Sequence, residues 1–253
     1  MGRFKDATKS GDMETHTIGG SNFQFSAAKI ETLGSAQQTL TTIVVDGSGS
    51  VGGFWEDIKA VIREVVRACR QSPRADSMML RVVVFSDDVE EVHGLVPLQD
   101  CNDDDYDSMD MPGSLTALYD ASYSAIKATT KYGRALTQKQ YDVNGAVFII
   151  TDGGDNRSKT TPTMVKEALA EARTSEAMES IMPVLIGVNT DASSGLNSYL
   201  ETFKNEAEFQ QYVTIGEATP ESLAKLGGFI SRSISSQSQA LGTGGPSKSL
   251  SFS

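Results

Sequence analysis

The fold is decided by residues 41–50, which read TTIVVDGSGS. The first five positions form an apolar run rich in β-branched residues, which is typical of a strand buried on both faces of a parallel sheet. The run ends at Asp46, where a cluster of glycine and serine begins. Apolar residues then recur at helical spacing over residues 54–69 and stop before Pro73. This part of the chain therefore predicts a strand, a polar loop and a helix.

The same alternation continues to residue 234. Strands are expected over residues 78–85, 89–93, 146–150, 181–188 and 212–215, and helices over residues 116–132, 162–178, 196–204 and 220–234. Strands that alternate with helices predict a three-layer α/β/α fold with a mostly parallel sheet. The link between the strands at 78–85 and 89–93 is too short for a crossover helix, so the second is expected as one antiparallel edge strand.

Length and composition favour a single domain. A chain of 253 residues with 39% hydrophobic content can bury one sizeable core, whereas two domains would each be thin. We expect an N-terminal arm over residues 1–38, the α/β domain over residues 39–236 and a Ser/Gly-rich tail over residues 237–253.

Charge and hydropathy exclude several classes of partner. The formal net charge of −11 opposes a phosphate backbone, so nucleic acid is not expected. No apolar stretch approaches membrane-spanning length and no targeting segment is visible, which predicts a cytoplasmic protein without a membrane partner. Cys69 and Cys101 do not form a disulfide framework, so a reducing compartment is expected.

The loop after the first strand carries candidate metal ligands. Asp46, Ser48 and Ser50 occupy alternate positions, and the glycines between them permit a tight backbone. Ligands of open α/β sheets bind beyond the carboxyl ends of the strands, so Asp46 and Asp152 converge if their strands are neighbours. Two carboxylates at one crevice repel each other unless a cation lies between them. Hard oxygen ligands of this kind suit Mg²⁺, Ca²⁺ or Mn²⁺.

These residues resemble a known pattern. The sequence is similar to the von Willebrand factor A (VWA) family, whose metal-ion-dependent adhesion site (MIDAS) uses D-x-S-x-S, a threonine and a distant aspartate. Asp46, Ser48 and Ser50 match the first element, Thr116 within GSLTALYDA (113–121) matches the second, and Asp152 within TDGG (151–154) matches the third. The resemblance covers roughly residues 40 to 235.

The resemblance has consequences for fold and function. It implies a Rossmann-like VWA fold of the bacterial intracellular type, with a metal held by Asp46, Ser48, Ser50, Thr116 and Asp152. In the family, a carboxylate of another protein completes the coordination of the metal. The cation would therefore bridge this acidic chain to an acidic side chain of a partner protein.

The loop sequence has three possible interpretations besides a metal site. Gly47, Gly49 and Gly52 spell G-x-G-x-x-G, the dinucleotide fingerprint, but Asp46 would repel the pyrophosphate and no acidic residue follows near positions 65–70. A phosphatase of the haloacid type needs Asp at position 48, which is Ser. The remaining alternative is that the Asp and Ser side chains only cap backbone groups at the turn.

No enzyme is expected. The two serines of the loop have no visible base, and the chain has only two histidines, His16 and His93. His93 is expected as an ordinary surface residue, and the acidic stretch 100–110 as a solvated loop. Asp155 and Asn156 either contact a ligand or cap the turn after Asp152.

Two further alternatives stay open. Gly227 and Gly228 in the last helix indicate either a movable element, as in the family, or close packing. The chain could also be a structural subunit of a homo-oligomer held by its terminal arms, with the metal only stabilising the loops. In that case Phe23, Phe25 and Ile30 of the arm would dock on a neighbouring copy.

Overall fold

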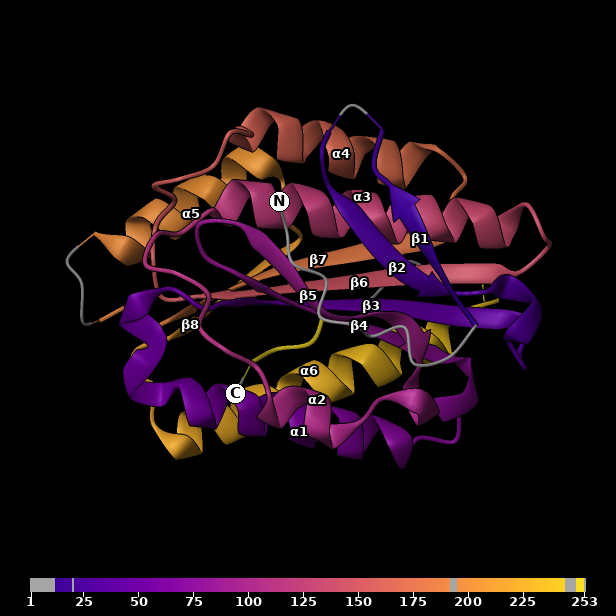
Figure 1. Ribbon diagram of the computed structural model, residues 1–253, viewed down its shortest axis with the longest axis horizontal. Coiled ribbons are helices and arrows are strands. Elements are labelled where there is room, and N and C mark those ends of the chain that lie inside the picture. Colours follow the sequence, from indigo (N-terminus) through magenta and orange to yellow (C-terminus); the bar gives the residue numbers. More distant parts are fainter. Residues whose placement is uncertain (1–11, 20, 192–194, 244–248, 253) are drawn as a thin grey trace.

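The computed structural model describes residues 12–19, 21–191, 195–243 and 249–252. Within them, eight strands form one sheet in the order β1-β2-β5-β4-β3-β6-β7-β8. Helices α3, α4 and α5 cover one face, and α1, α2 and α6 cover the other (Figure 1). The expected three-layer α/β/α fold with a mostly parallel sheet is confirmed.

Five neighbouring strands of the sheet are parallel to one another, and β8 among them forms one edge. They are β3 (Gln37–Asp46), β4 (Met78–Phe85), β6 (Asp142–Thr151), β7 (Ser180–Val188) and β8 (Gln211–Ile215). β3 lies between β4 and β6, and Val45 pairs with Ile150. Because helices cover both faces, nearly every residue of β3 and β6 is buried. The pairing of β3 with β6 is the arrangement that brings Asp46 and Asp152 to one edge.

The helices lie where they were expected, but α3 and α6 end five and six residues later than expected. They are α1 (Trp55–Arg70), α3 (Leu118–Thr137), α4 (Pro162–Thr174), α5 (Leu196–Ala207) and α6 (Pro220–Ala240). α4 ends at Thr174 rather than at residue 178, and Glu176 just beyond has a φ of 51°, which a helix cannot contain. The side chain of Thr219 caps α6 by accepting a hydrogen bond from the Ser222 N–H at 3.1 Å.

The small residue Gly227 lies where α6 packs on α1. A Cβ atom on Gly227 would lie 3.6 Å from the backbone oxygen of Val61 and 3.8 Å from the side chain of Glu64. Glycine therefore lets the two helices approach closely, and packing accounts for it without any need for a movable helix.

β5 (Val89–Pro97) is antiparallel to β4, as expected, but it does not lie at the edge. β2 (Gln24–Ala28) pairs with it in parallel, and β1 (Met13–Thr17) adds a further antiparallel strand. The physical reason is burial, because Phe25 is completely buried in the core beneath α3. In addition, the Tyr132 hydroxyl donates to the Ala28 carbonyl at 2.7 Å.

The acidic stretch 100–110 is folded, contrary to the expectation of a solvated loop. It contains the short helix α2 (Asp103–Asp107), whose Tyr106 is completely buried. The Tyr106 hydroxyl lies 3.0 Å from Nε2 of His93, which is itself buried. The expectation that His93 is a surface residue is therefore wrong, and burial lowers its pKa, which favours the neutral ring.

The chain ends are partly described. α6 continues to Ala240, past the expected start of the tail, and Phe252 packs on Phe229 with ring centroids 5.7 Å apart. The parts of the expected arm and tail at residues 1–11, 244–248 and 253 lie outside the described residues. Among the residues that are described, no helix is both long and apolar enough to cross a membrane.

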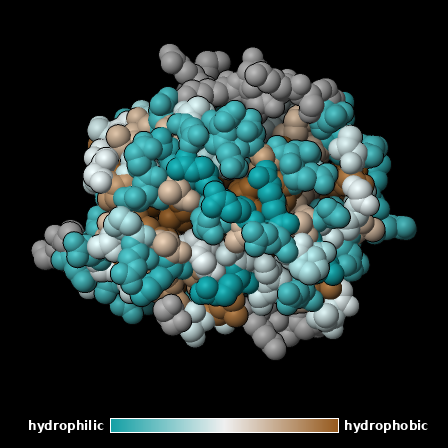
Figure 2. Space-filling model, turned by 90° about the horizontal axis from the view of Figure 1, so that it is seen from below, coloured by the Kyte–Doolittle hydropathy of each residue, from teal (hydrophilic) through white to brown (hydrophobic). Residues whose placement is uncertain are grey.

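The face formed by α1, α2 and α6 is mostly hydrophilic. Figure 2 shows this face from below, with hydrophobic colour mainly in hollows between polar residues. The apolar side chains of these helices are directed at the sheet instead, where residues such as Ile58, Val65 and Phe229 are buried. The fold thus buries its apolar surface in two layers, one on each side of the sheet.

The burial of Phe25 yields a first prediction. Phe25→Ala should lower the free energy of unfolding by about 3–5 kcal/mol, because it leaves a cavity between the sheet and α3. Urea unfolding followed by circular dichroism measures the effect. The half-buried Phe23 is the matched control, and Phe23→Ala should have a clearly smaller effect. Equal, small losses for both variants would show that the β1–β2 hairpin is not part of the core.

Candidate metal centre

Asp46 is the last residue of β3 and lies at the carboxyl edge of the sheet. It is 1% exposed. Its Oδ1 accepts a hydrogen bond from the Ser48 N–H at 2.9 Å, and its Oδ2 accepts one from the Thr151 hydroxyl at 2.6 Å. A Cβ on Gly47 would lie 2.5 Å from Cγ1 of Val84, so the chain can leave β3 in this direction only with glycine here.

The two serines connect Asp46 to Asp152. The hydroxyls of Ser48 and Ser50 lie 3.1 Å apart, and the Ser50 hydroxyl donates to Oδ1 of Asp152 at 2.7 Å. Ser48 is buried and Ser50 is exposed. The loop after β3 thus reaches across to the end of β6 through side-chain hydroxyls.

Thr116 arrives from a third segment, the loop before α3. A Cβ placed on Gly153 would lie 3.3 Å from the Thr116 hydroxyl oxygen and 3.9 Å from Oδ2 of Asp46. The hydroxyl and the carboxylate therefore approach the same point beside Gly153. The structure brings Asp46, Ser48, Ser50, Thr116 and Asp152 together at one edge of the sheet.

Asn156 holds Thr116 in place. The Thr116 N–H donates to the side-chain oxygen of Asn156 at 2.8 Å, and the Asn156 N–H donates to the Thr116 carbonyl at 3.0 Å. Asp155 accepts from the Tyr119 N–H at 3.3 Å, at the start of α3. Of the two readings left open by the sequence, these contacts support fixing of the turn rather than contact with a ligand.

Two positioning residues were missed by the sequence analysis. Thr151 orients Asp46, and its place directly before Asp152 at the end of a strand was the available signal. Oδ1 of Asp87 accepts from the backbone N–H groups of Ser114 and Leu115 at 3.2 and 2.8 Å, which fixes the chain just before Thr116. No local sequence pattern indicates this role of Asp87, because its hydrogen-bond partners lie in a different loop.

The two carboxylates resist ionisation in the absence of a cation. Burial raises the pKa of Asp46 above its ordinary value, although hydrogen bonds from Thr151 and Ser48 oppose the shift. The pKa of Asp152 is raised to about 6, mainly by burial and also by the nearby charge of Asp46, while the hydrogen bond from the Ser50 hydroxyl opposes the shift. A positive charge placed between the two groups would reverse this effect.

The donors at this edge fit a hard divalent cation. They are two carboxylates and three hydroxyls, all oxygen, which match Mg²⁺, Ca²⁺ or Mn²⁺ better than a soft metal. In the described part of the chain, no three His, Cys, Asp or Glu side chains cluster as a metal site. A divalent cation at this centre would be neutralised by the two carboxylates, and the five donors would leave one position of an octahedral coordination sphere for a further ligand.

Comparison with known proteins establishes the family. The model of the von Willebrand factor type A domain matches residues 42–224, so the chain belongs to this family. No curated protein sequence matches.

Solved structures share the fold. The proximal thread matrix protein 1 of the mussel byssus is 19% identical with a TM-score of 0.53, over 79% of this chain and 46% of its own. The D319A mutant of the PilB minor pilin from Streptococcus sanguinis is 12% identical with a TM-score of 0.57, over 87% of this chain and 66% of its own. BatB from Bacteroides thetaiotaomicron is 16% identical with a TM-score of 0.54, over 77% of this chain and 98% of its own.

The present chain therefore spans about half the length of the mussel protein. A further structure of that protein is described as having a zinc-occupied MIDAS motif, with 19% identity and a TM-score of 0.52 over 79% of this chain and 46% of its own.

The raised pKa of Asp152 gives a second prediction, for the metal-free protein. Asp152 loses its proton near pH 6 in the folded state and near pH 4 in the unfolded state, so stability falls as the pH rises from about 4 to 6 and is lowest above pH 6. Lowering the pH from 7 to 5 should therefore stabilise the wild type by roughly 1 kcal/mol relative to Asp152→Asn, after allowance for solvent screening. Urea unfolding in chelator at both pH values measures the difference. An identical response of the two proteins would contradict it.

Proposed function

We propose that the chain is a metal-dependent protein-interaction module. Asp46, Ser48, Ser50, Thr116 and Asp152 hold a divalent cation, and an acidic side chain of another protein completes its coordination. The observation that carries this proposal is the convergence of two poorly solvated carboxylates, linked through Ser48 and Ser50, at the carboxyl edge of the sheet. Without a cation the two charges disfavour each other, and with one they become ligands.

The charge of the chain supports a cation as the bridge. A protein of net charge −11 repels an acidic partner at long range, and a bound cation supplies the local attraction. We propose Mg²⁺, with Ca²⁺ or Mn²⁺ as alternatives, because all five donors are oxygen. The zinc described in the mussel protein is a reason to include Zn²⁺ in any titration.

The surroundings of the centre suit a protein partner. Met111 is 42% exposed and Leu115 is 36% exposed, and they are two of the three large exposed apolar side chains in the described part of the chain. Leu115 adjoins Thr116, and the thioether of Met111 approaches Gly52 in the metal loop, within 3.9 Å of a Cβ placed there. Exposed apolar residues beside a polar centre are typical of docking surfaces. The partner surface would present Asp or Glu flanked by apolar residues.

Binding rather than catalysis is the proposed role. A serine nucleophile needs a base, and the two histidines are engaged elsewhere. His93 is bonded to Tyr106 and to the Gly94 carbonyl, and His16 stacks on Phe25. Their positions leave Ser48 and Ser50 without an imidazole base among the described residues.

We also propose a reducing cellular setting and a chain that is not held in a homo-oligomer by its terminal arms. Cys69 and Cys101 are free and buried, which suits the proposed reducing interior of a bacterial cell. The alternative of a homo-oligomer held by terminal arms is less well supported, because Phe25 lies in the core of its own chain and is not available to a neighbour.

Metal binding is the third prediction. Isothermal titration of Mg²⁺, Mn²⁺, Ca²⁺ and Zn²⁺ should show one saturable site in the wild type and none in Asp46→Ala. The variant should stay folded, because Thr151 keeps a hydrogen bond to the Gly153 carbonyl at 3.0 Å. Asp76→Ala is the matched control, since Asp76 is an exposed carboxylate before β4, at the opposite end of the strands. Equal metal binding by the wild type and Asp46→Ala would contradict the proposed metal centre.

Partner binding is the fourth prediction. A peptide library with Asp or Glu flanked by apolar residues, screened in Mg²⁺, should give ligands that are lost in chelator. Replacing the acidic residue by its amide should weaken them at least tenfold, since the amide cannot match a carboxylate at a cation. Binding that persists in chelator, or that tolerates the amide, would contradict a metal bridge.

A further inference from the structure

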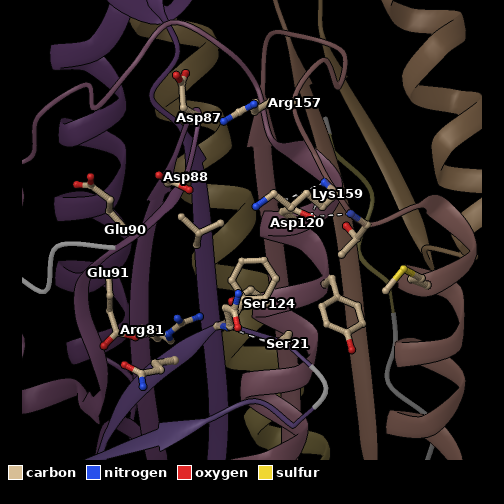
Figure 3. Close-up of a pocket in the computed structure, with 17 residues that line it drawn as sticks. Ser21, Arg81, Asp87, Asp88, Glu90, Glu91, Asp120, Ser124, Arg157 and Lys159 are labelled. Carbon is tan, nitrogen blue, oxygen red and sulfur yellow. Dashed lines mark hydrogen bonds and ion pairs between the residues drawn. The ribbon is translucent and has the colours of Figure 1, made fainter. Parts of the chain in front are cut away.

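A cavity of about 700 Å³ lies apart from the metal centre, on the face of the sheet covered by α3. Its walls come from the turn between β1 and β2, from β4 and β5, from α3, and from the segment before α4 (Figure 3). This volume lies within the usual range of small-molecule sites. Nothing in the proposed metal-dependent role uses it.

Arg81 at this cavity is a buried cation with an uncommitted donor. The residue is 1% exposed, and its Nε donates to Oε2 of Glu91 at 2.7 Å. Its guanidinium also lies 5.9 Å from the ring centroid of Phe25. Its Nη1 has no hydrogen-bond partner in the described structure. Buried donors are nearly always paired, and a charged one left unpaired costs more than a neutral one.

Two hydroxyls at the same cavity are also buried without a partner. One is that of Ser124 on α3, and the other is that of Thr160 before α4. In Figure 3 the side chain of Arg81 extends from β4 in the direction of Ser124. Three unsatisfied polar groups, one of them charged, therefore border one cavity. Acceptor oxygens of a ligand are the partners that such donors lack.

The acidic residues of the lining are mostly committed to internal donors. Asp120 accepts from the backbone N–H groups of Lys159 and Thr160, and Glu91 accepts from Arg81 and from the Ser26 N–H. Asp87 accepts from the backbone before Thr116. Glu91 is thus neutralised by Arg81, whereas Asp87 and Asp120 keep their charge and accept from backbone N–H groups.

The lining carries five carboxylates and three cations, and two of the cations have no ion-pair partner in the described part of the chain. Arg157 and Lys159 are exposed at the lining, and neither side chain makes an ion pair within the described residues. Of the remaining acids, Asp88 is exposed, and Glu90 points away from Arg81 in Figure 3. The attraction for an anion therefore comes from the unpaired donor of Arg81 and from these two cations, not from an overall positive lining.

The rest of the wall is apolar. Phe23, Val89, Tyr123 and Met164 line the cavity beside the polar groups. A simple inorganic ion would leave this surface and most of the volume unused. Apolar walls with a few convergent polar groups are the usual composition of a site for an organic ligand.

We propose that this cavity binds a small organic anion, with a carboxylate or phosphate group on an apolar body. The anionic oxygens accept from Nη1 of Arg81 and from the hydroxyl of Ser124, toward which the Arg81 side chain extends in Figure 3. The apolar body packs on Phe23 and Tyr123, and Lys159 adds attraction at the entrance. None of the five proposed metal ligands lines this cavity, although Asp87 lines it and also holds the chain before Thr116.

Isothermal titration of the full chain in chelator tests the proposal with three probes. They are 3-phenylpropionate, phenyl phosphate and the uncharged analogue 3-phenylpropan-1-ol. At least one anion should bind at millimolar concentration or tighter, and the alcohol at least tenfold more weakly. The tighter of the two anions identifies the preferred group. Failure of both anions to bind, or equal binding of the alcohol, would overturn the proposal.

Matched serine variants of α3 locate the binding site. Ser124→Ala should weaken the bound anion about tenfold, the effect of one lost hydrogen bond to a charged group. Ser122→Ala is the control, because its buried hydroxyl donates to the Leu118 carbonyl and does not line the cavity. Lys159→Met, at an exposed position, should weaken binding severalfold at low salt and less at high salt. Equal effects of the two serine variants would place the anion elsewhere.

Discussion

The parallel pairing of β3 with β6 brings two carboxylates to one edge of the sheet, and the polar architecture there depends on that contact. Asp46 and Asp152 end up beside each other because parallel strands leave the sheet on the same side. Burial raises the pKa of both carboxyls, the charge of Asp46 adds to the shift at Asp152, and the surrounding hydroxyls compensate only in part. The negative charges at this edge are poorly compensated by the protein alone, and a bound cation would compensate them. The same edge receives Thr116 from the loop before α3, which completes a set of oxygen donors.

Much of this could be predicted from the sequence because the decisive signals are local. The β-branched run before Asp46 and the alternation of strands and helices define the sheet, and the spacing of Asp46, Ser48 and Ser50 is visible within five residues. The β1–β2 hairpin could not be predicted in the same way. Its strands are five residues each, and β2 depends on Phe25 reaching the core under α3, which is a long-range contact. His93 was misjudged for a similar reason, since its partner Tyr106 lies on a five-residue helix in an acidic stretch with no helical periodicity.

The positioning residues show a second limit of local patterns. Thr151, Asn156 and Asp87 act through hydrogen bonds to groups in other loops, so their roles become visible only when the loops are placed together. Asn156 and Asp87 hold the backbone around Thr116 from two sides. The rigidity of the centre thus comes from side chains bonded to backbone rather than from regular secondary structure. These contacts join residues that are close in space but far apart in the sequence, so neither periodicity nor motif spacing predicts them.

Polar groups with hydrogen-bond partners and buried polar groups without them have different roles in this fold. The segment from Asp152 to Thr160 supplies one carboxylate to the metal centre and three lining residues to the cavity, and Asp87 both lines the cavity and holds the chain before Thr116. Within this shared framework, Asp87, Asp120 and Asn156 are bonded inside the protein, so they fix the loops. Nη1 of Arg81 and the hydroxyls of Ser124 and Thr160 are buried without partners, so they contribute nothing to the fold that offsets their loss of water. A group that weakens the free protein in this way has a physical reason to be present when a ligand satisfies it.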